Sequence, residues 1–139
     1  MNILILQGPN LNLLGLKANQ AKQQLTLDKL NKSIRTHVKG KDITLKFLQT
    51  HKQFQAINFI QRNRNWANGL LIIPTSWAAF DITLVDTINI TQLKTASVYF
   101  SEPINIGPSE KSSILLGENI THFTGEPIAV CQQALDYLI

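Results

Sequence analysis

The chain has 139 residues, 44 % hydrophobic and 16 % charged, which is enough for one domain with one core and too apolar for a disordered protein. No apolar stretch approaches the length of a membrane span, and Met1-Asn2 leads into a strand-like run without the basic segment of a signal peptide. The single cysteine, Cys131, excludes an intrachain disulfide and a cysteine-based metal cluster. We therefore expect a cytoplasmic protein with one domain, residues 1–139, and no metal site.

The net charge of +4 is divided unevenly along the chain. Residues 1–65 contain eleven of the thirteen Lys and Arg residues and carry +9, whereas residues 66–139 carry −5. This asymmetry is typical of an anion-binding face or of complementary faces that meet in an oligomer, and solvated helix surfaces are the simplest explanation. The basic residues are spread over several predicted elements without a recognised motif, which argues against nucleic-acid binding.

The first part of the chain predicts a strand, a long loop and a helix. Asn2–Gln7 is apolar enough for a buried strand, and Gly8-Pro9 ends it in a turn. From there to about Leu25 we find no apolar periodicity, and we predict a polar loop. Thr26 is expected to cap a helix whose apolar residues recur at helical spacing up to Gly40, a residue type that often ends helices.

The middle of the chain repeats this order. Ile43, Leu45 and Phe47 alternate as in a half-buried strand, and helical spacing follows from Phe54 to about Asn65. The apolar run 70–73, stopped by Pro74, is typical of a strand buried on both faces.

Two more strand and helix pairs complete the pattern. Asp81 is expected to cap a helix, and 96–100 predicts a fourth strand. Residues 103–117 are predicted to be irregular, and 119–123 to form a fifth strand. Pro127 suits the first position of a final helix.

This alternation predicts a flavodoxin-like three-layer α/β/α fold with a five-stranded parallel sheet in the order 2-1-3-4-5. In that order the loops after strands one, three and four meet at one crevice. We therefore expect Asn10, the segment 74–77 and Ser101 to lie near one another there.

The segment Gly8-Pro9-Asn10-Leu11-Asn12-Leu13-Leu14-Gly15 resembles the opening motif of the type II 3-dehydroquinate dehydratases. The similarity runs nearly without gaps to about Glu102 and resumes at Ala134-Leu135-Asp136. The resemblance implies a homo-oligomer, commonly a dodecamer of trimers, and a lyase of the shikimate pathway that needs no metal or organic cofactor. It also implies removal of water through an enolate, with a tyrosine base beside an arginine, a histidine acid, and asparagine and backbone N–H groups as ligands.

At most positions that this chemistry requires, the chain departs from the family pattern. Asn10 matches the first asparagine, but Lys17 stands where the family has arginine and Lys22 where it has the tyrosine base. Pro74 is kept, whereas Ile73 replaces the asparagine before it.

The later motifs differ in the same way. Trp77 stands at an aromatic position of the family, and an arginine of the following helix falls at Val85. On the fourth strand, Tyr99 replaces the acid histidine and Ser97 the glutamate that orients it, while Ser101 is kept.

Together these differences predict a non-catalytic or altered-ligand homologue, because groups that act as a unit fail together. The candidate catalytic positions are Lys22, Tyr99 and Asn10, and the candidate substrate-binding positions are Lys17, Pro74, Trp77 and Ser101. Two alternatives stay open: residual lyase activity through Lys22 or Tyr99, and binding of anionic partners through the basic N-terminal half. The simpler structural interpretation makes Lys22 an exposed lysine, and Tyr99 and Trp77 packed core residues.

Overall fold

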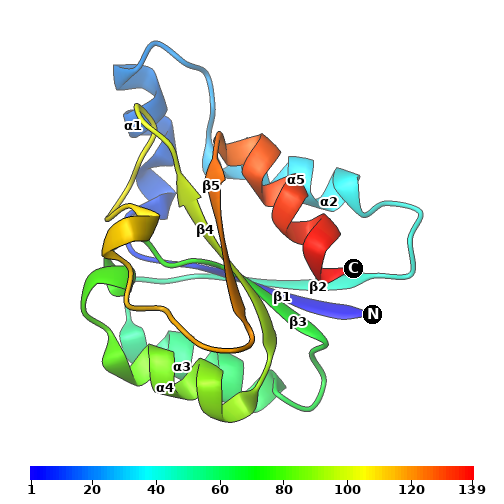
Figure 1. The fold of residues 1–139 in the computed structure, drawn as a ribbon. Helices are drawn as coiled ribbons and strands as arrows, with labels where there is room; N and C mark the ends of the chain where they lie inside the picture. The colour runs from blue at the N-terminus through cyan, green and yellow to red at the C-terminus, as the bar shows by residue number, and fades with distance from the viewer.

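Five strands pair in parallel through the centre of the computed structural model, which describes residues 1–139 (Figure 1). They are β1 (Asn2–Gln7), β2 (Thr44–Gln49), β3 (Gly69–Ile73), β4 (Lys94–Phe100) and β5 (Ile120–Gly125). Their order in the sheet is β2-β1-β3-β4-β5, with every neighbouring pair parallel. The predicted flavodoxin-like topology is confirmed.

Helices cover both faces of this sheet (Figure 1). One face carries α1 (Leu14–Gln20), α2 (Leu27–His37) and α5 (Pro127–Leu138), and the other carries α3 (Gln53–Asn63) and α4 (Ile82–Thr91). Right-handed crossovers between parallel strands require such an arrangement. None of these helices combines the length and the apolar character that crossing a membrane demands.

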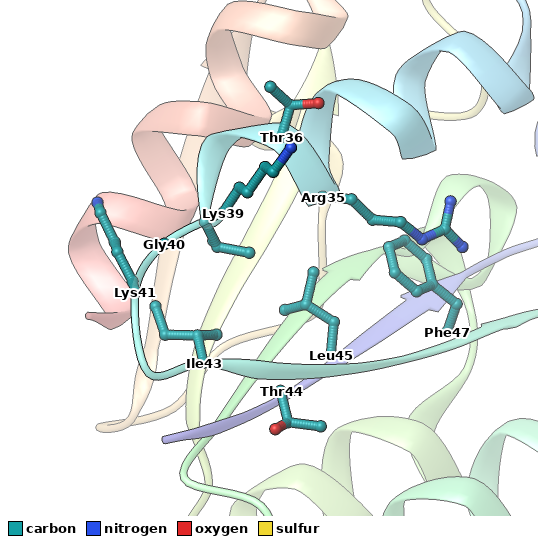
Figure 2. Close-up of a pocket in the computed structure, with 10 residues that line it drawn as sticks. Arg35, Thr36, Lys39, Gly40, Lys41, Ile43, Thr44, Leu45 and Phe47 are labelled. Carbon is teal, nitrogen blue, oxygen red and sulfur yellow. The ribbon is translucent and has the colours of Figure 1, made fainter.

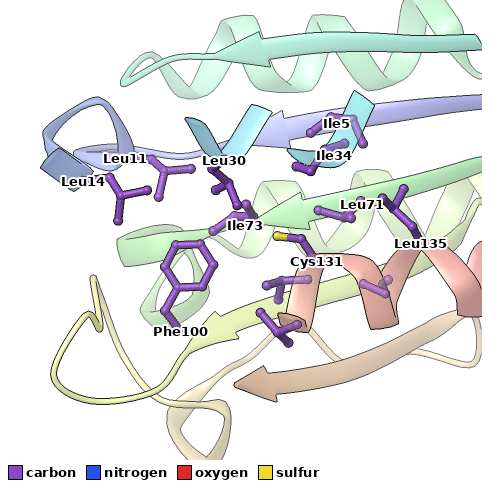
Figure 3. Packing of buried hydrophobic residues seen from close by; sticks show 14 of the residues in the cluster. Ile5, Leu11, Leu14, Leu30, Ile34, Leu71, Ile73, Phe100, Cys131 and Leu135 are labelled. Atoms are coloured by element: carbon purple, nitrogen blue, oxygen red, sulfur yellow. The ribbon is translucent and has the colours of Figure 1, made fainter. Parts of the chain in front are cut away.

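The core lies in two layers, one on each side of the sheet. Ile3 and Ile5 of β1 pack toward α2 and α5, whereas Leu4 and Leu6 pack toward α3 and α4, and all four are fully buried. Figure 3 shows the first layer, in which Cys131 of α5 lies among aliphatic side chains. Burial raises the pKa of this thiol to about 12, so Cys131 behaves as a small hydrophobic residue, as expected.

The helix starts follow the predicted capping residues. The Thr26 hydroxyl accepts a hydrogen bond from the Lys29 N–H at 3.2 Å, and an Asp81 carboxylate oxygen accepts one from the Leu84 N–H at 3.1 Å. Pro127 is the first residue of α5. The Thr26 and Asp81 side chains satisfy N–H groups that have no partner within the helix itself.

The prediction of a polar loop from Gly8 to Leu25 is wrong for most of that segment. Leu11–Leu13 forms one turn of 3-10 helix, and α1 follows it without a break. Leu11, Leu14 and Ala18 are fully buried against the sheet. Their spacing of three and four residues is helical, but the Asn, Gln and Lys residues between them obscure it.

The long connection between β4 and β5 is irregular, as predicted, apart from a short 3-10 turn at Glu110–Ser112. It passes the carboxyl edge of the sheet and then returns on the side of the sheet that α3 and α4 cover, where Leu115 joins the core and the Asn89 amide donates to the Leu116 carbonyl at 2.9 Å (Figure 1). Its first part therefore becomes one wall of the crevice described next.

Candidate functional site

A crevice with a volume of about 380 Å³ opens at the carboxyl edge of the sheet, between α1 and the segment that follows β4. Eight residues line it: Asn10, Leu13, Leu16, Lys17, Gln20, Asn105, Ile106 and Gly107. The loops after strands one and four thus meet as predicted. Part of the wall comes from α1, the helix that we did not expect.

The loop after β3 lies between the other two loops. A Cβ atom on Gly107 would lie 2.5 Å from the carbonyl carbon of Thr75, and one on Gly8 would lie 2.4 Å from the carbonyl oxygen of Pro74. Thr75 itself has a positive φ of 49°, and its hydroxyl donates to the Pro9 carbonyl at 2.8 Å. The two glycines allow the three loop backbones to approach without intervening side chains.

Asn10 and Lys17, two of the candidate site residues, both line the crevice. Asn10 is exposed and has a positive φ of 69°, and its backbone N–H donates to Nδ1 of His51 at 3.4 Å. Lys17 projects from α1 and is the one charged side chain of the lining. An anion in the crevice would therefore meet a cation and no carboxylate.

Lys22 lies outside this lining. It follows α1 in a turn, is exposed and adopts a positive φ of 59°, and its N–H donates to the Asn19 carbonyl at 3.0 Å. The structure therefore does not bring Lys22 together with Asn10 and Lys17 around the crevice.

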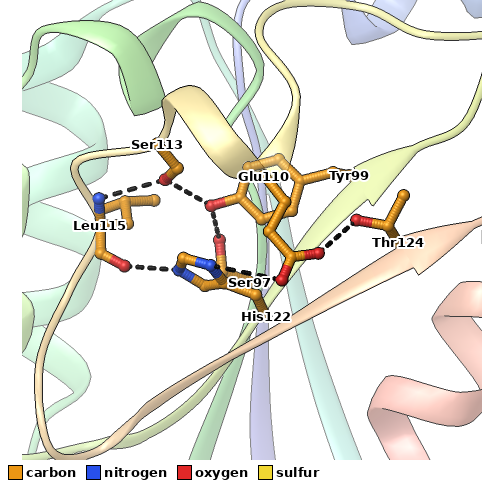
Figure 4. A network of polar contacts seen from close by, with 7 residues as sticks. All are labelled: Ser97, Tyr99, Glu110, Ser113, Leu115, His122 and Thr124. Carbon is orange, nitrogen blue, oxygen red and sulfur yellow. Dashed lines mark hydrogen bonds and ion pairs between the residues drawn. The ribbon is translucent and has the colours of Figure 1, made fainter.

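Tyr99 lies in the core on the face that α3 and α4 cover, and only 4 % of it is exposed. Its hydroxyl accepts a hydrogen bond from Ser97 at 2.8 Å and lies 2.6 Å from the Ser113 hydroxyl (Figure 4). Burial raises the pKa of this phenol, the two serine hydrogen bonds oppose the rise, and the negative charge of Glu110 adds to it. Tyr99 is therefore a neutral core residue with a satisfied hydroxyl, as the simpler interpretation of the sequence expected, and it does not line the crevice.

His122 and Glu110 lie beside Tyr99, and no local pattern in the sequence predicts that they meet. The His122 ring meets the Tyr99 ring edge-on at 5.3 Å, and its Nδ1 lies 3.9 Å from a Glu110 oxygen. Its Nε2 is 2.6 Å from the Leu115 carbonyl, and Glu110 also accepts from the Thr124 hydroxyl (Figure 4). These contacts attach the β4–β5 connection to β5 and do not face the crevice.

The remaining candidate residues support the edge of the sheet without lining the crevice. Trp77 is 2 % exposed and packs in the core with Ala78 and Leu84. It is a packed core residue, as the simpler interpretation expected, and does not line the crevice. Pro74 is buried under the stacked loops. Ser101 is half-buried, and its N–H donates to the Gly125 carbonyl at 2.9 Å, so it extends the pairing of β4 with β5.

The polar groups of the crevice offer hydrogen bonds and one positive charge. The amides of Asn10, Gln20 and Asn105 donate and accept, and Lys17 supplies the charge. Nowhere in the structure do three His, Cys, Asp or Glu side chains gather as metal ligands would. The arrangement is suited to holding a small anion.

Comparison with known proteins gives a consistent result. The model of the family described as dehydroquinase class II matches residues 1–139. A 3-dehydroquinate dehydratase of Clostridium botulinum (strain 657 / Type Ba4) is 29 % identical over 100 residues, which cover 72 % of this chain and 68 % of that protein. One of Campylobacter hominis is 26 % identical over 115 residues, covering 83 % and 74 %.

Solved structures agree on the fold. The type II dehydroquinase from Butyrivibrio crossotus superposes with a TM-score of 0.81 at 23 % identity, covering 99 % of this chain and 97 % of that one. A 3-dehydroquinate dehydratase-like protein from Bifidobacterium longum gives a TM-score of 0.62 at 17 % identity, covering 99 % and 94 %. The family match along the whole chain and the shared topology lead to one conclusion: this chain belongs to the class II dehydroquinase family.

Proposed function

We propose that this chain is a non-catalytic member of its family, which binds a small anion in the crevice and does not dehydrate 3-dehydroquinate. One observation carries the proposal: the lining of the crevice contains amides and a lysine but no group of the kind that exchanges protons near neutral pH. The residues at the positions of the family's base and acid lie elsewhere, Lys22 in an exposed turn and Tyr99 in the core.

The lining also supports a proposal about the ligand. Leu13, Leu16 and Ile106 make part of the wall apolar, and Lys17 supplies a single cation. A carboxylate with an apolar body would use both features. A polyhydroxylated acid would place some hydroxyl groups against aliphatic side chains, where they lose hydrogen bonds to water.

Residual lyase activity is the second candidate, and His51 is the observation that favours it. Its imidazole lies beside Asn10 at the rim of the crevice and is exposed. A histidine at that place is a potential proton donor, although no carboxylate is hydrogen-bonded to it.

A direct dehydratase assay separates the two candidates. We expect no formation of 3-dehydroshikimate above background from 3-dehydroquinate, even at high protein concentration, because base and acid are both absent from the crevice. A 3-dehydroquinate dehydratase such as that of Clostridium botulinum serves as the positive control. A turnover rate within a few orders of magnitude of that control would contradict the proposal. Loss of this turnover in His51→Ala would then identify the proton donor.

Anion binding is tested through Lys17, with Lys22 as a matched control. A panel of aromatic and aliphatic carboxylic acids is screened for compounds that raise the melting temperature of the wild type. We expect Lys17→Glu to abolish this rise, because it reverses the one charge of the lining. Lys22→Glu makes the same change of charge outside the crevice and should keep the stabilisation. Equal loss in both variants, or no stabilisation by any acid in the panel, would contradict binding in the crevice.

The structural role of Tyr99 predicts how stability depends on pH. Tyr99→Phe should lower the free energy of unfolding at neutral pH by about 1 kcal/mol, because Ser97 and Ser113 lose a shared partner. Since burial raises the folded-state pKa above 10.0, the phenol ionises first in the unfolded chain. The stability difference between wild type and variant should therefore narrow as the pH rises above about 10 in urea titrations. A widening difference would indicate a lowered pKa, as a tyrosine base requires.

We also propose that the chain forms a homo-oligomer, a trimer or a dodecamer. Two observations support this: the opposed charges of the two halves, and the exposed apolar side chains Phe80, Ile82 and Ile90 at and along α4, of which Ile90 is 80 % exposed. Light scattering should give the mass of several chains, and Ile90→Asp should reduce it. Ile128→Asp on α5 is the matched control, and a single-chain mass for the wild type would refute the proposal.

A further inference from the structure

The edge of the sheet at β2 is open. β2 pairs only with β1. The Thr44 N–H donates to the Met1 carbonyl at 2.9 Å and the Thr50 N–H to the Gln7 carbonyl at 3.0 Å, so both face the β1 side. Backbone groups alternate in direction along a strand, so the N–H and C=O groups of Leu45 and Phe47 point away from β1. These groups have no partner within the chain.

A groove with a volume of about 750 Å³ runs beside this edge, between β2, the last turn of α2 and the turn that joins them (Figure 2). Its apolar floor consists of Val38 and the half-buried side chains of Ile43, Leu45 and Phe47. Most of the polar rim is basic, because Arg35, Lys39 and Lys41 line the groove and no carboxylate does. The Arg35 guanidinium lies 4.4 Å from the centre of the Phe47 ring and so forms one side wall.

The usual protection of an edge strand is missing here. Proteins block such edges with charged side chains, prolines or bulges. Lys46, the one charged residue of β2, turns instead toward α3, where its ammonium donates to Asn63 at 3.0 Å and lies 4.1 Å from the centre of the Trp66 ring. The register from Asn2↔Thr44 to Gln7↔Gln49 is unbroken, so the strand contains no bulge.

We propose that this groove binds an extended peptide that carries both apolar and acidic residues, and that the peptide pairs with β2 as a sixth strand. Its backbone would pair with the free groups of Leu45 and Phe47. Every second side chain of the peptide would face the groove. Of these, the central ones would be apolar and lie over the floor, and the two at the ends would be acidic, one near Arg35 and the other near Lys39 and Lys41. This inference concerns a surface separate from the crevice and does not depend on the proposed function.

The geometry favours a peptide over a nucleic acid. A phosphate backbone would use the three cations but would leave the edge groups of Leu45 and Phe47 unpaired and the aliphatic floor in contact with water. The aromatic ring of the groove, Phe47, already stacks against Arg35 and so is not a free platform for a base. An extended chain uses all three features together.

Binding is tested by fluorescence anisotropy with the labelled peptide Glu-Thr-Val-Thr-Val-Thr-Glu, which is long enough to span the six residues of β2. We expect a Kd of about 100 µM or tighter, and at least about tenfold weaker binding of the version with lysine in place of glutamate. Two N-methylated peptides are compared. Methylation of the residues whose N–H groups face β2 should weaken binding at least about tenfold, and methylation of the residues whose N–H groups face solvent should have little effect. Equal effects of the two methylated sets, or no preference for glutamate, would overturn the proposal.

Variants of the protein locate the binding surface. The double substitution Lys39→Glu and Lys41→Glu should weaken binding at least about tenfold, whereas Lys52→Glu with Lys111→Glu, an equal change of charge at exposed positions elsewhere, should not. The amide protons of Leu45 and Phe47 should exchange more slowly with the peptide bound. Unchanged exchange, or an oligothymidine that binds as tightly and displaces the peptide, would refute strand addition.

Discussion

Complete burial of the two central strands is the constraint on which the rest of the structure depends. Residues 3–6 of β1 and 70–73 of β3 are apolar on both faces of the sheet, and almost none of their surface reaches solvent. Such strands are stable only when helices cover both sides, and this explains the three layers and the parallel connections. The polar side chains of β1 lie at its two ends, and those of β2 lie along an edge of the sheet. The crevice and the open edge at β2 are found at these places.

The polar groups of Tyr99 and His122 lie in and beside the core, away from the crevice. The hydroxyl and imidazole groups of Tyr99 and His122 lie under the β4–β5 connection, where they bind Ser113 and Leu115 and hold that connection in place. The crevice keeps amides and a lysine. The crevice and the Tyr99–His122 cluster are therefore separate features of the fold, and the cluster serves to hold the β4–β5 connection.

The elements that follow from local patterns were predictable from the sequence, and those that depend on the meeting of distant segments were not. Strand alternation at Ile43, Leu45 and Phe47 and the caps Thr26 and Asp81 are local signals, and the structure confirms them. Trp77 lies on a short 3-10 turn, and sequence alone does not tell which side of such a turn faces the core. The contact of His122 with Glu110 requires the β4–β5 connection to fold back over the sheet, and no pattern in the intervening residues 111–121 predicts this fold.

The stacking of Thr75 against Gly8 and Gly107 has a consequence for how this protein is able to diverge. A side chain added at position 107 would collide with the Thr75 backbone, and the loop after β3 is blocked on its other side by Gly8. Neither the loop after β3 nor the segment at Gly107 has room to change its backbone alone. A new loop conformation therefore requires substitutions at two sites that lie far apart in the chain. Evolution at this edge of the sheet should therefore proceed by joint substitution of the three loops, while α1, which contributes its side chains from outside the stack, remains free to vary and to alter what the crevice accepts.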